Sequence, residues 1–176
     1  MNNLIKILLL AAWLEGLGGG KMTMALELSS PVIKAGEYIP EVFTCRGRDI
    51  SPPLVWRRVP SGSVTLALTC TDPDAPVGIW THWVIFNIPA SLPGLEEEFS
   101  RRPVLPSGIS QGMNDFREIG YMGPCPPPGR PHRYYFKLFA LDRKLDLPPG
   151  VGRAQLEKAM PGHILGEAEL LGLFQR

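Results

Sequence analysis

The residues of this chain best suited to chemistry are two histidines, a tyrosine and two aspartates near the ends of strand-like segments. His132 and Tyr134 begin one such segment, Asp72 and Asp74 follow a second, and His82 stands near the start of a third. A charged imidazole donates two hydrogen bonds and a phenol donates one, which suits phosphate oxygens. A carboxylate can fix an imidazole tautomer or accept from an ammonium group. These residue types predict a pocket for a small anion or zwitterion.

A loop rich in proline and glycine, residues 120–131, leads directly into the segment that begins at His132. Proline fixes φ, and glycine permits backbone conformations that are closed to other residues. Such a loop can hold backbone amides and side chains in place at little entropy cost when a ligand binds. We interpret this loop as a preformed mouth of the pocket.

Three apolar segments are predicted to be the strands that position these side chains. In residues 132–141, the side-chain period of two places His132 and Tyr134 on one face. Residues 64–70 form an apolar run that ends in a turn-forming Asp-Pro-Asp-Ala-Pro sequence. Residues 80–88 are apolar on both faces, which predicts a strand that is buried on both sides.

Length and composition indicate one globular domain. The chain has 176 residues, 44% of them hydrophobic, which is enough for one full core. The formal net charge is +1, and lysines and arginines are scattered along the sequence. We therefore expect no nucleic-acid partner.

Together these segments resemble the phosphatidylethanolamine-binding protein family, which includes the Raf kinase inhibitor proteins. The resemblance covers nearly all of residues 24–176 and rests on several separated motifs in the same order. Four further segments, residues 43–47, 51–56, 111–116 and 123–127, are similar to the bacterial and archaeal branch. The motifs that carry the resemblance are Asp72-Pro73-Asp74-Ala75-Pro76, Trp80 with His82, and Gly123-Pro124 leading into His132-Arg133-Tyr134.

The resemblance implies a mostly β fold, a two-sheet antiparallel β-sandwich with one or two short helices, formed by residues 24–176. It also implies a small pocket for phosphate, phosphorylethanolamine or similar anions, with neither a cofactor nor a metal. Relatives inhibit kinases or proteases, so a protein partner of either kind is a further expectation. The ligand-binding residues that the resemblance implies are Asp72, Asp74, Trp80, His82, Gly123, Pro124, His132 and Tyr134.

Some of these residues also have a purely structural interpretation. Asp-Pro and Asp-Ala-Pro form turns, so one aspartate is expected to cap local amides, and Asp72 is favoured over Asp74 as the pocket residue. Tryptophans, Trp80 included, pack in cores more often than they stack on ligands. Near the C-terminus we predict a helix over 152–160, ended by a proline. A final strand over 167–174 is expected to follow.

An enzyme is the alternative function. Two imidazoles and a carboxylate also suit a transition metal, and a histidine with an aspartate partner can activate water. However, no serine or threonine is predicted to lie in a strand-turn-helix elbow, and the sequence contains no His-Glu-x-x-His motif. Cys125 is the one plausible nucleophile near the histidines, and its proximity is implied only by the resemblance. We therefore expect a binding protein, with no catalytic residue, over a hydrolase or a metal-dependent enzyme.

The three cysteines, Cys45, Cys70 and Cys125, lack metal-ligand spacing. Cys70 is predicted to be a small core residue on a strand. Cys45 and Cys125 lie in loops and could form a disulfide or act as reactive thiols near the pocket mouth. Because cytosolic disulfides are rare, the sequence favours three free thiols.

Residues 1–23 are expected to lie outside the domain. Their apolar run, residues 7–14, is shorter than the roughly 20 residues needed to span a bilayer, but it fits the core of a secretory signal. Glu15 directly after this run argues against export. The Gly-Gly-Gly-Lys sequence before Met22 would also arise from a translated ribosome-binding site. We expect a cytoplasmic protein that starts at Met22 or Met24, with export through a signal in residues 1–20 as the alternative.

Overall fold

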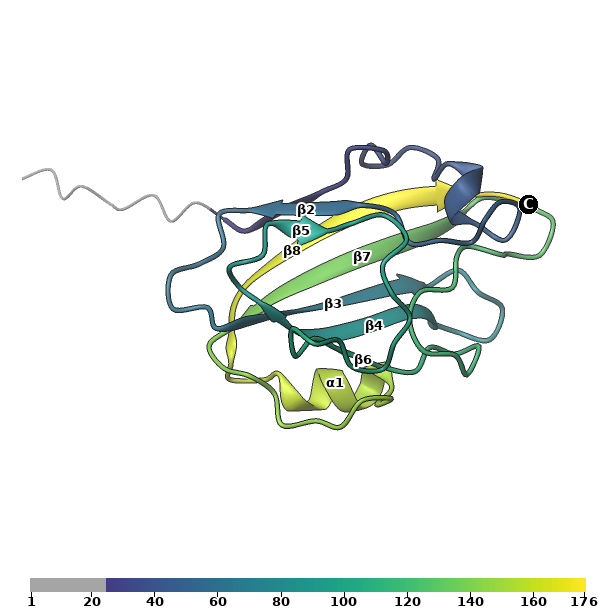
Figure 1. Ribbon diagram of the computed structural model, residues 1–176. Coiled ribbons are helices and arrows are strands. Elements are labelled where there is room, and N and C mark those ends of the chain that lie inside the picture. The colour runs from purple at the N-terminus through teal and green to yellow at the C-terminus, as the bar shows by residue number, and fades with distance from the viewer. Residues whose placement is uncertain (1–24) are drawn as a thin grey trace, which may run out of the picture.

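Two antiparallel β-sheets pack against each other in the computed structural model of the chain, which describes residues 25–176 (Figure 1). The expected leader, residues 1–23, lies outside the described residues. The smaller sheet has the order β1-β2-β5. Its strands are β1 (Glu27–Ser29), β2 (Leu54–Arg57) and β5 (Gly94–Leu95).

The larger sheet has the order β6-β4-β3-β7-β8, and every neighbouring pair in it is antiparallel. The middle strand, β3, pairs antiparallel with β4 and with β7, so both of these neighbours run in the direction opposite to β3. Its strands are β3 (Thr65–Asp72), β4 (Trp80–Pro89), β6 (Ser110–Gln111), β7 (His132–Leu141) and β8 (Ile164–Phe174).

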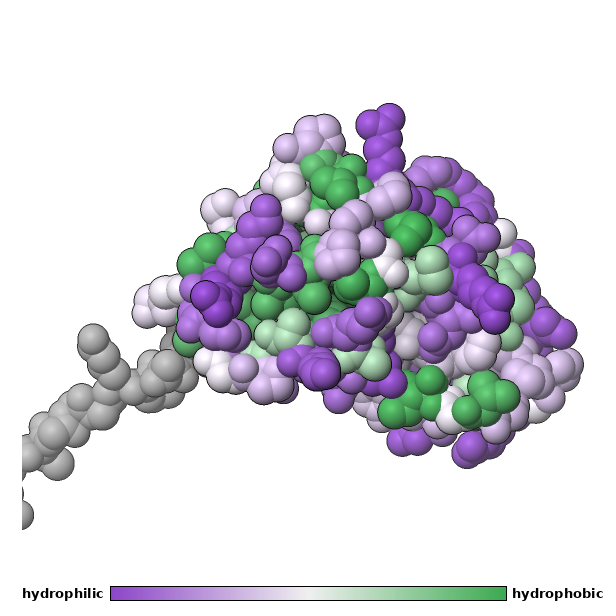
Figure 2. Space-filling model, turned by 90° about the horizontal axis from the view of Figure 1, so that it is seen from below, coloured by the Kyte–Doolittle hydropathy of each residue, from purple (hydrophilic) through white to green (hydrophobic). Residues whose placement is uncertain are grey.

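The alternation of side chains along the central strands divides the molecule into two apolar layers. Leu66 and Leu68 on β3 point into the main core between the two sheets. Ala67, between them, points to the opposite face and joins a second cluster. The helix α1 (Arg153–Ala159), which lies on the side of the molecule viewed in Figure 2, covers that face and buries Leu156 completely. Strand β4 is therefore buried on both faces, as its apolar run predicted.

The predicted sandwich is confirmed, and the predicted elements lie close to the observed ones. The helix expected over 152–160 is α1, and the strand expected over 167–174 is β8, which begins earlier, at Ile164. A short 3-10 helix, η1 (Glu41–Phe43), is the second helical element. Residues 25–176 contain no helix with the length and hydrophobicity that crossing a bilayer requires.

Two β-bulges interrupt the alternation on β4, and the first lies near the end of that strand. Leu66 pairs with Ile88, whereas Leu68 pairs with Ile85, so β4 contains one extra residue at this place. Asn87 takes the left-handed conformation there, with φ of 56°. A bulge shifts the side-chain phase, and Ile85 and Ile88 consequently both face the main core.

The second bulge involves a predicted site residue. Cys70 on β3 lies opposite Trp83, and the next residue of β3, Thr71, lies opposite Thr81. His82 is therefore the extra residue of β4. Its ring lies on the main-core side, 5.2 Å from the Tyr134 ring centroid. Strict alternation would have pointed this imidazole away from Tyr134, toward the face that α1 covers.

The Asn87 side chain is predicted to be a strong determinant of stability. It accepts from the Leu145 N–H at 2.8 Å and donates to the Leu145 carbonyl at 3.0 Å, and it is buried. Asn87→Ala leaves both backbone groups unpaired, so we expect the free energy of unfolding to fall by about 2–3 kcal/mol in urea denaturation. The control is Lys144→Ala at an exposed neighbouring position, with a change under about 0.5 kcal/mol. An equal effect of the two substitutions would contradict this role for Asn87.

Candidate functional site

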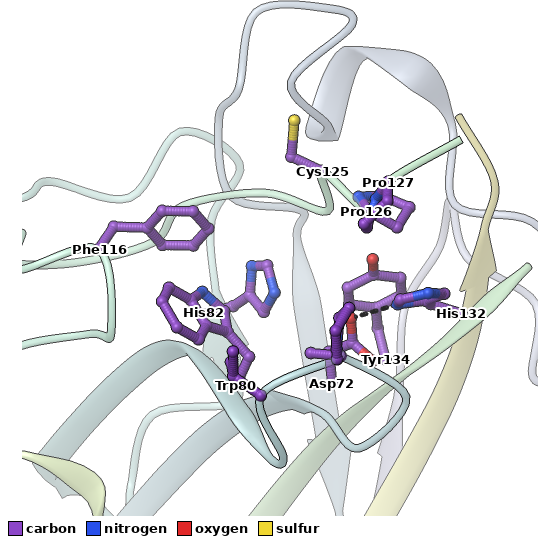
Figure 3. A pocket seen from close by; sticks show the side chains of 12 residues that line it. Asp72, Trp80, His82, Phe116, Cys125, Pro126, Pro127, His132 and Tyr134 are labelled. Carbon is purple, nitrogen blue, oxygen red and sulfur yellow. Dashed lines mark hydrogen bonds and ion pairs between the residues drawn. The ribbon is translucent and has the colours of Figure 1, made fainter. Parts of the chain in front are cut away.

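A cavity of about 190 Å³ lies at one end of the sandwich, where three strands of the larger sheet meet the loops (Figure 3). Asp72 is the last residue of β3, and it pairs with Trp80, the first residue of β4. His132 begins β7, the other neighbour of β3. The residues that line the cavity are Asp72, Ala75, Pro76, Val77, Trp80, His82, Phe116, Cys125, Pro126, Pro127, His132 and Tyr134.

Asp72 and His132 form a buried hydrogen-bonded pair at the base of the cavity (Figure 3). Asp72 Oδ2 lies 2.7 Å from His132 Nδ1. The other carboxylate oxygen, Oδ1, accepts from the backbone N–H of Asp74 at 2.8 Å, which fixes the side chain. An ionised carboxylate can only accept, so Nδ1 carries the proton and Nε2 of His132 is left for the cavity.

His82 is held by its backbone surroundings. Its Nδ1 lies 2.7 Å from the Met122 carbonyl oxygen, which can only accept, so Nδ1 carries a proton. Burial lowers the pKa of His82 below its ordinary value of 6.5, which favours the neutral ring. Nε2 is then a hydrogen-bond acceptor.

The hydroxyl of Tyr134 is the most informative atom of the site. Among residues 25–176, it is the one fully buried side-chain polar atom without a hydrogen-bond partner, although the residue lines the cavity. Burial and the nearby Asp72 carboxylate raise the pKa of this phenol well above its ordinary range, so it keeps its proton. Buried polar groups are rarely left unpaired, which indicates that the partner of this hydroxyl comes from the cavity.

Aromatic rings and prolines form the apolar walls. The Phe116 ring packs edge-on against both Trp80 and His82, with 5.3 Å between ring centroids in each pair. Pro126 and Pro127 lie across the cavity from this group (Figure 3). Such walls exclude water and so strengthen the electrostatic contacts of the few polar atoms inside.

Five of the eight predicted ligand-binding residues line the cavity: Asp72, Trp80, His82, His132 and Tyr134. The expectation that Trp80 packs in the core is wrong, because it is half-exposed at the mouth, whereas Trp56 and Trp83 are buried core residues. The remaining three predicted residues lie outside the lining.

Asp74 is turned toward the outer side of β7. Its carboxylate accepts from the Arg133 backbone N–H at 3.0 Å and from the Arg133 side chain, with both contacts at 2.9 Å. Arg130 approaches the same carboxylate at 3.6 Å. The Arg133 guanidinium lowers the pKa of Asp74 to about 2. Asp74 therefore ties the turn after β3 to the start of β7 and does not contact the cavity.

Gly123 and Pro124 position the loop and are not part of the lining. The Gly123 N–H donates to Asp49 Oδ1 at 2.6 Å, and a Cβ at Gly123 would lie 2.3 Å from the Phe43 carbonyl oxygen. Only glycine fits at such a close backbone approach. The Pro124 carbonyl accepts from the Cys45 N–H at 3.1 Å.

Cys45 and Cys125 form a disulfide, so the expectation of three free thiols is wrong. Their Cα atoms are 5.4 Å apart although 80 residues separate them in sequence. The loop after Gly123 folds onto the segment after η1, and only the tertiary structure brings the two sulfurs together. Cys70 is a free, buried thiol on β3, as predicted.

Sequence reasoning missed several residues of the site. Pro126 and Pro127 lie in the predicted pocket loop, residues 120–131, and the high proline and glycine content of that loop was the available signal. Phe116 belongs to the segment 111–116 that carried part of the resemblance, whereas Val77 gave no signal, because single apolar residues in loops are common. Asp49, which orders the loop through Gly123, is in an unremarkable polar stretch.

The described part of the chain contains no group of three or more His, Cys, Asp or Glu side chains arranged to hold a metal ion. In the cavity, only Asp72 and the two histidines are of ligand type, and His82 uses one nitrogen on a backbone carbonyl. The arrangement is better suited to exchanging hydrogen bonds with a small polar ligand.

Comparison with known proteins gives a consistent result. The family model described as phosphatidylethanolamine-binding protein matches residues 29–175. A UPF0098 protein of Methanothermobacter thermautotrophicus is 55% identical over 138 residues, which are 78% of this chain and 91% of the relative. A UPF0098 protein of Aquifex aeolicus is 49% identical over 153 residues, 86% of this chain and 89% of the relative.

Two solved structures share the fold. YbcL of Escherichia coli, titled a new member of the mammalian PEBP family, has a TM-score of 0.81 and 34% identity, covering 87% of this chain and 99% of YbcL. A putative PEBP homologue from Chlamydia trachomatis has a TM-score of 0.79 and 39% identity, covering 86% of this chain and 98% of that chain. The sequence match therefore extends over the same residues as the sandwich.

Tyr134→Phe is predicted to leave the ligand-free protein as stable as wild type or to stabilise it by up to about 1 kcal/mol. The substitution removes a buried hydroxyl that has no partner within the described chain, and with it a desolvation cost. Tyr121→Phe is the matched control, because the equally buried Tyr121 hydroxyl donates to the Phe43 carbonyl at 2.8 Å. We expect the control to lose about 1–2 kcal/mol in urea denaturation. Destabilisation of both variants to the same extent would show that Tyr134 has a partner in the protein.

His82 is predicted to make the protein less stable in mild acid. The folded-state pKa of His82 is below 6.5, so the unfolded chain binds this proton more readily. The contribution of neutral His82 to the free energy of unfolding is complete above pH 6.5, and it is lost as the pH falls toward the lowered pKa of the folded state. His82→Gln should therefore show a smaller decrease in the free energy of unfolding between about pH 7 and about pH 5. Identical pH profiles for the variant and the wild type would contradict the neutral assignment.

Proposed function

Since this chain belongs to the phosphatidylethanolamine-binding protein family, we propose that its cavity binds a small anionic ligand, such as phosphate or phosphorylethanolamine, and carries out no reaction. The observation that carries the proposal is the buried, unpaired hydroxyl of Tyr134. A buried donor without a partner in the protein costs free energy unless a ligand satisfies it.

Tyr134 and His132 are the proposed donors to the anion. The raised pKa of Tyr134 keeps its O–H available as a donor. His132, when protonated, donates from Nε2 while Nδ1 stays bonded to Asp72. The Asp72 carboxylate then offsets the charge of the His132 imidazolium. The two buried charges are therefore paired with each other whether or not a ligand is bound.

His82 supplies the complementary acceptor. Its neutral ring presents Nε2 without a proton, which suits the O–H of a phosphate monoanion or the N–H of an ammonium group. A zwitterionic head group could use the donors and this acceptor together. The cavity volume of about 190 Å³ limits the bound part to a group of head-group size.

A hydrolase is the second candidate, and the Asp72–His132 pair at 2.7 Å is the observation that favours it. Among the described residues that line the cavity there is no serine or threonine, and the Cys125 sulfur is already bonded to Cys45. Such an enzyme would need water as its nucleophile. We favour binding, and turnover of a phosphate monoester that disappears in His132→Ala would reverse that preference.

Two wider expectations become proposals on the same basis. Inhibition of a kinase or a protease would place the partner on the loops around the cavity, where Val77 and Phe116 are exposed apolar residues.

The disulfide favours the exported alternative over a cytoplasmic protein, because the glutathione pool of the cytosol keeps most thiols reduced. Alkylation of thiols in intact cells before lysis would distinguish the two compartments.

Asp72→Ala and His132→Ala are each predicted to weaken the binding of phosphorylethanolamine by about 1.5–3 kcal/mol, since each breaks a charge-assisted contact in the cavity. Calorimetric titration measures the change directly. Asp142→Ala and His163→Ala are the matched controls, because these residues form an Asp–His pair at 3.0 Å outside the cavity. Wild-type affinity in a cavity variant would remove that residue from the site.

A further inference from the structure

The disulfide lies at the cavity itself and is within reach of solvent. Cys125 is half-buried and lines the cavity, while Cys45 is exposed. Figure 3 shows the Cys125 side chain beside Pro126 and Pro127 at the mouth. A thiol reagent in solution can therefore approach the disulfide from the side of Cys45.

The loop that follows Cys125 has few other attachments. Within the described chain, no backbone–backbone hydrogen bond joins residues 125–131 to any other segment. Four of these seven residues are prolines, which have no N–H to donate. Three side-chain contacts remain: Gln175 Nε2 donates to the Gly129 carbonyl at 2.6 Å, Arg130 approaches Asp74 at 3.6 Å, and Arg176 approaches Cys125 Sγ at 3.6 Å. The disulfide is thus the one covalent tether of this wall of the cavity.

We propose that the Cys45–Cys125 disulfide is a redox control of the cavity: reduction by a dithiol releases the wall formed by Pro126 and Pro127 and weakens anion binding. The inference rests on the proposed function, because it assigns a regulation to the same site. A ligand that binds the reduced protein must order the loop at the moment of binding, and that entropy cost is subtracted from its affinity.

The difference in exposure between the two cysteines assigns the order of the chemical steps. The reductant thiolate attacks Sγ of Cys45, the more exposed residue, the Cys45–Cys125 bond breaks, and its electron pair goes to Cys125 Sγ. Arg176 Nη1, 3.6 Å from Cys125 Sγ, stabilises this leaving thiolate. The second thiolate of the dithiol then attacks the other sulfur of the same dithiol, which is bonded to Cys45 in the mixed disulfide. This step closes the disulfide of the reductant and releases Cys45 as a thiolate. Both cysteine thiolates take protons from water, so two electrons pass from the dithiol to the protein.

The test is calorimetric titration of inorganic phosphate and phosphorylethanolamine into oxidised protein, dithiothreitol-reduced protein and protein reoxidised after reduction. We expect about tenfold weaker binding in the reduced state and full recovery on reoxidation. The Cys45→Ser/Cys125→Ser double variant should bind as weakly as reduced protein, with or without reductant. Cys70→Ala, which removes the buried free thiol, should respond to reductant as wild type does.

The outcomes separate the two proposals. No binding in the oxidised state contradicts the proposed function, whereas equal binding in both states overturns the redox control and leaves the function standing. Hydrogen exchange should show faster exchange confined to residues 120–131 after reduction. Loss of the far-ultraviolet sheet signal on reduction would also overturn the inference, because the disulfide would then hold the whole fold. Arg176→Gln should slow reduction several-fold, and an unchanged rate would remove Arg176 from the leaving-group role.

Discussion

The antiparallel pairing of β3 with both of its neighbours is the constraint on which the site depends. Since β4 and β7 run opposite to β3, the last residue of β3 must lie beside the first residues of the other two strands. Asp72 therefore meets His132 across 60 residues of sequence, and their hydrogen bond joins two strands that the main core already holds in register. The position of the polar groups is a consequence of the register.

The same end of the sandwich balances two opposing demands. The main core needs apolar residues, and Phe136, two residues beyond Tyr134 on the same strand face, is completely buried. Asp72, His82 and His132 are also buried there, which is costly unless each polar atom finds a partner. Backbone groups and neighbouring side chains satisfy the carboxylate and both Nδ1 atoms. Among the described residues the Tyr134 hydroxyl has no partner, and the proposed ligand would satisfy it.

The sequence was sufficient for the parts of the fold that follow from regular periodicity. The strand over 132–141, with His132 and Tyr134 on one face, needed only the alternation of β structure. His82 could not be placed in this way, because a bulge turns it to the main-core side and bulges have no clear sequence signature. The sandwich and the other correctly predicted lining residues came from the family resemblance, since periodicity alone does not pair distant strands.

The errors have a common physical cause, which is that loop contacts are decided by tertiary structure. Asp74 and Asp72 are both turn residues, and only the neighbouring Arg133 draws Asp74 to the outer side. Gly123 is needed because Phe43 approaches from a distant segment. The same folding of one loop onto another places Cys125 against Cys45. None of these partners is close in sequence.

The position of Trp80 has a practical consequence for following this protein in solution. Among the tryptophans of the described residues, Trp56 and Trp83 are sealed in the core, and only Trp80 combines partial exposure with a place in the cavity wall. Indole emission shifts with the polarity of its surroundings, and a guest that displaces water from the mouth changes those surroundings for this one ring. The fold thus carries its own optical probe of occupancy, which requires no attached dye.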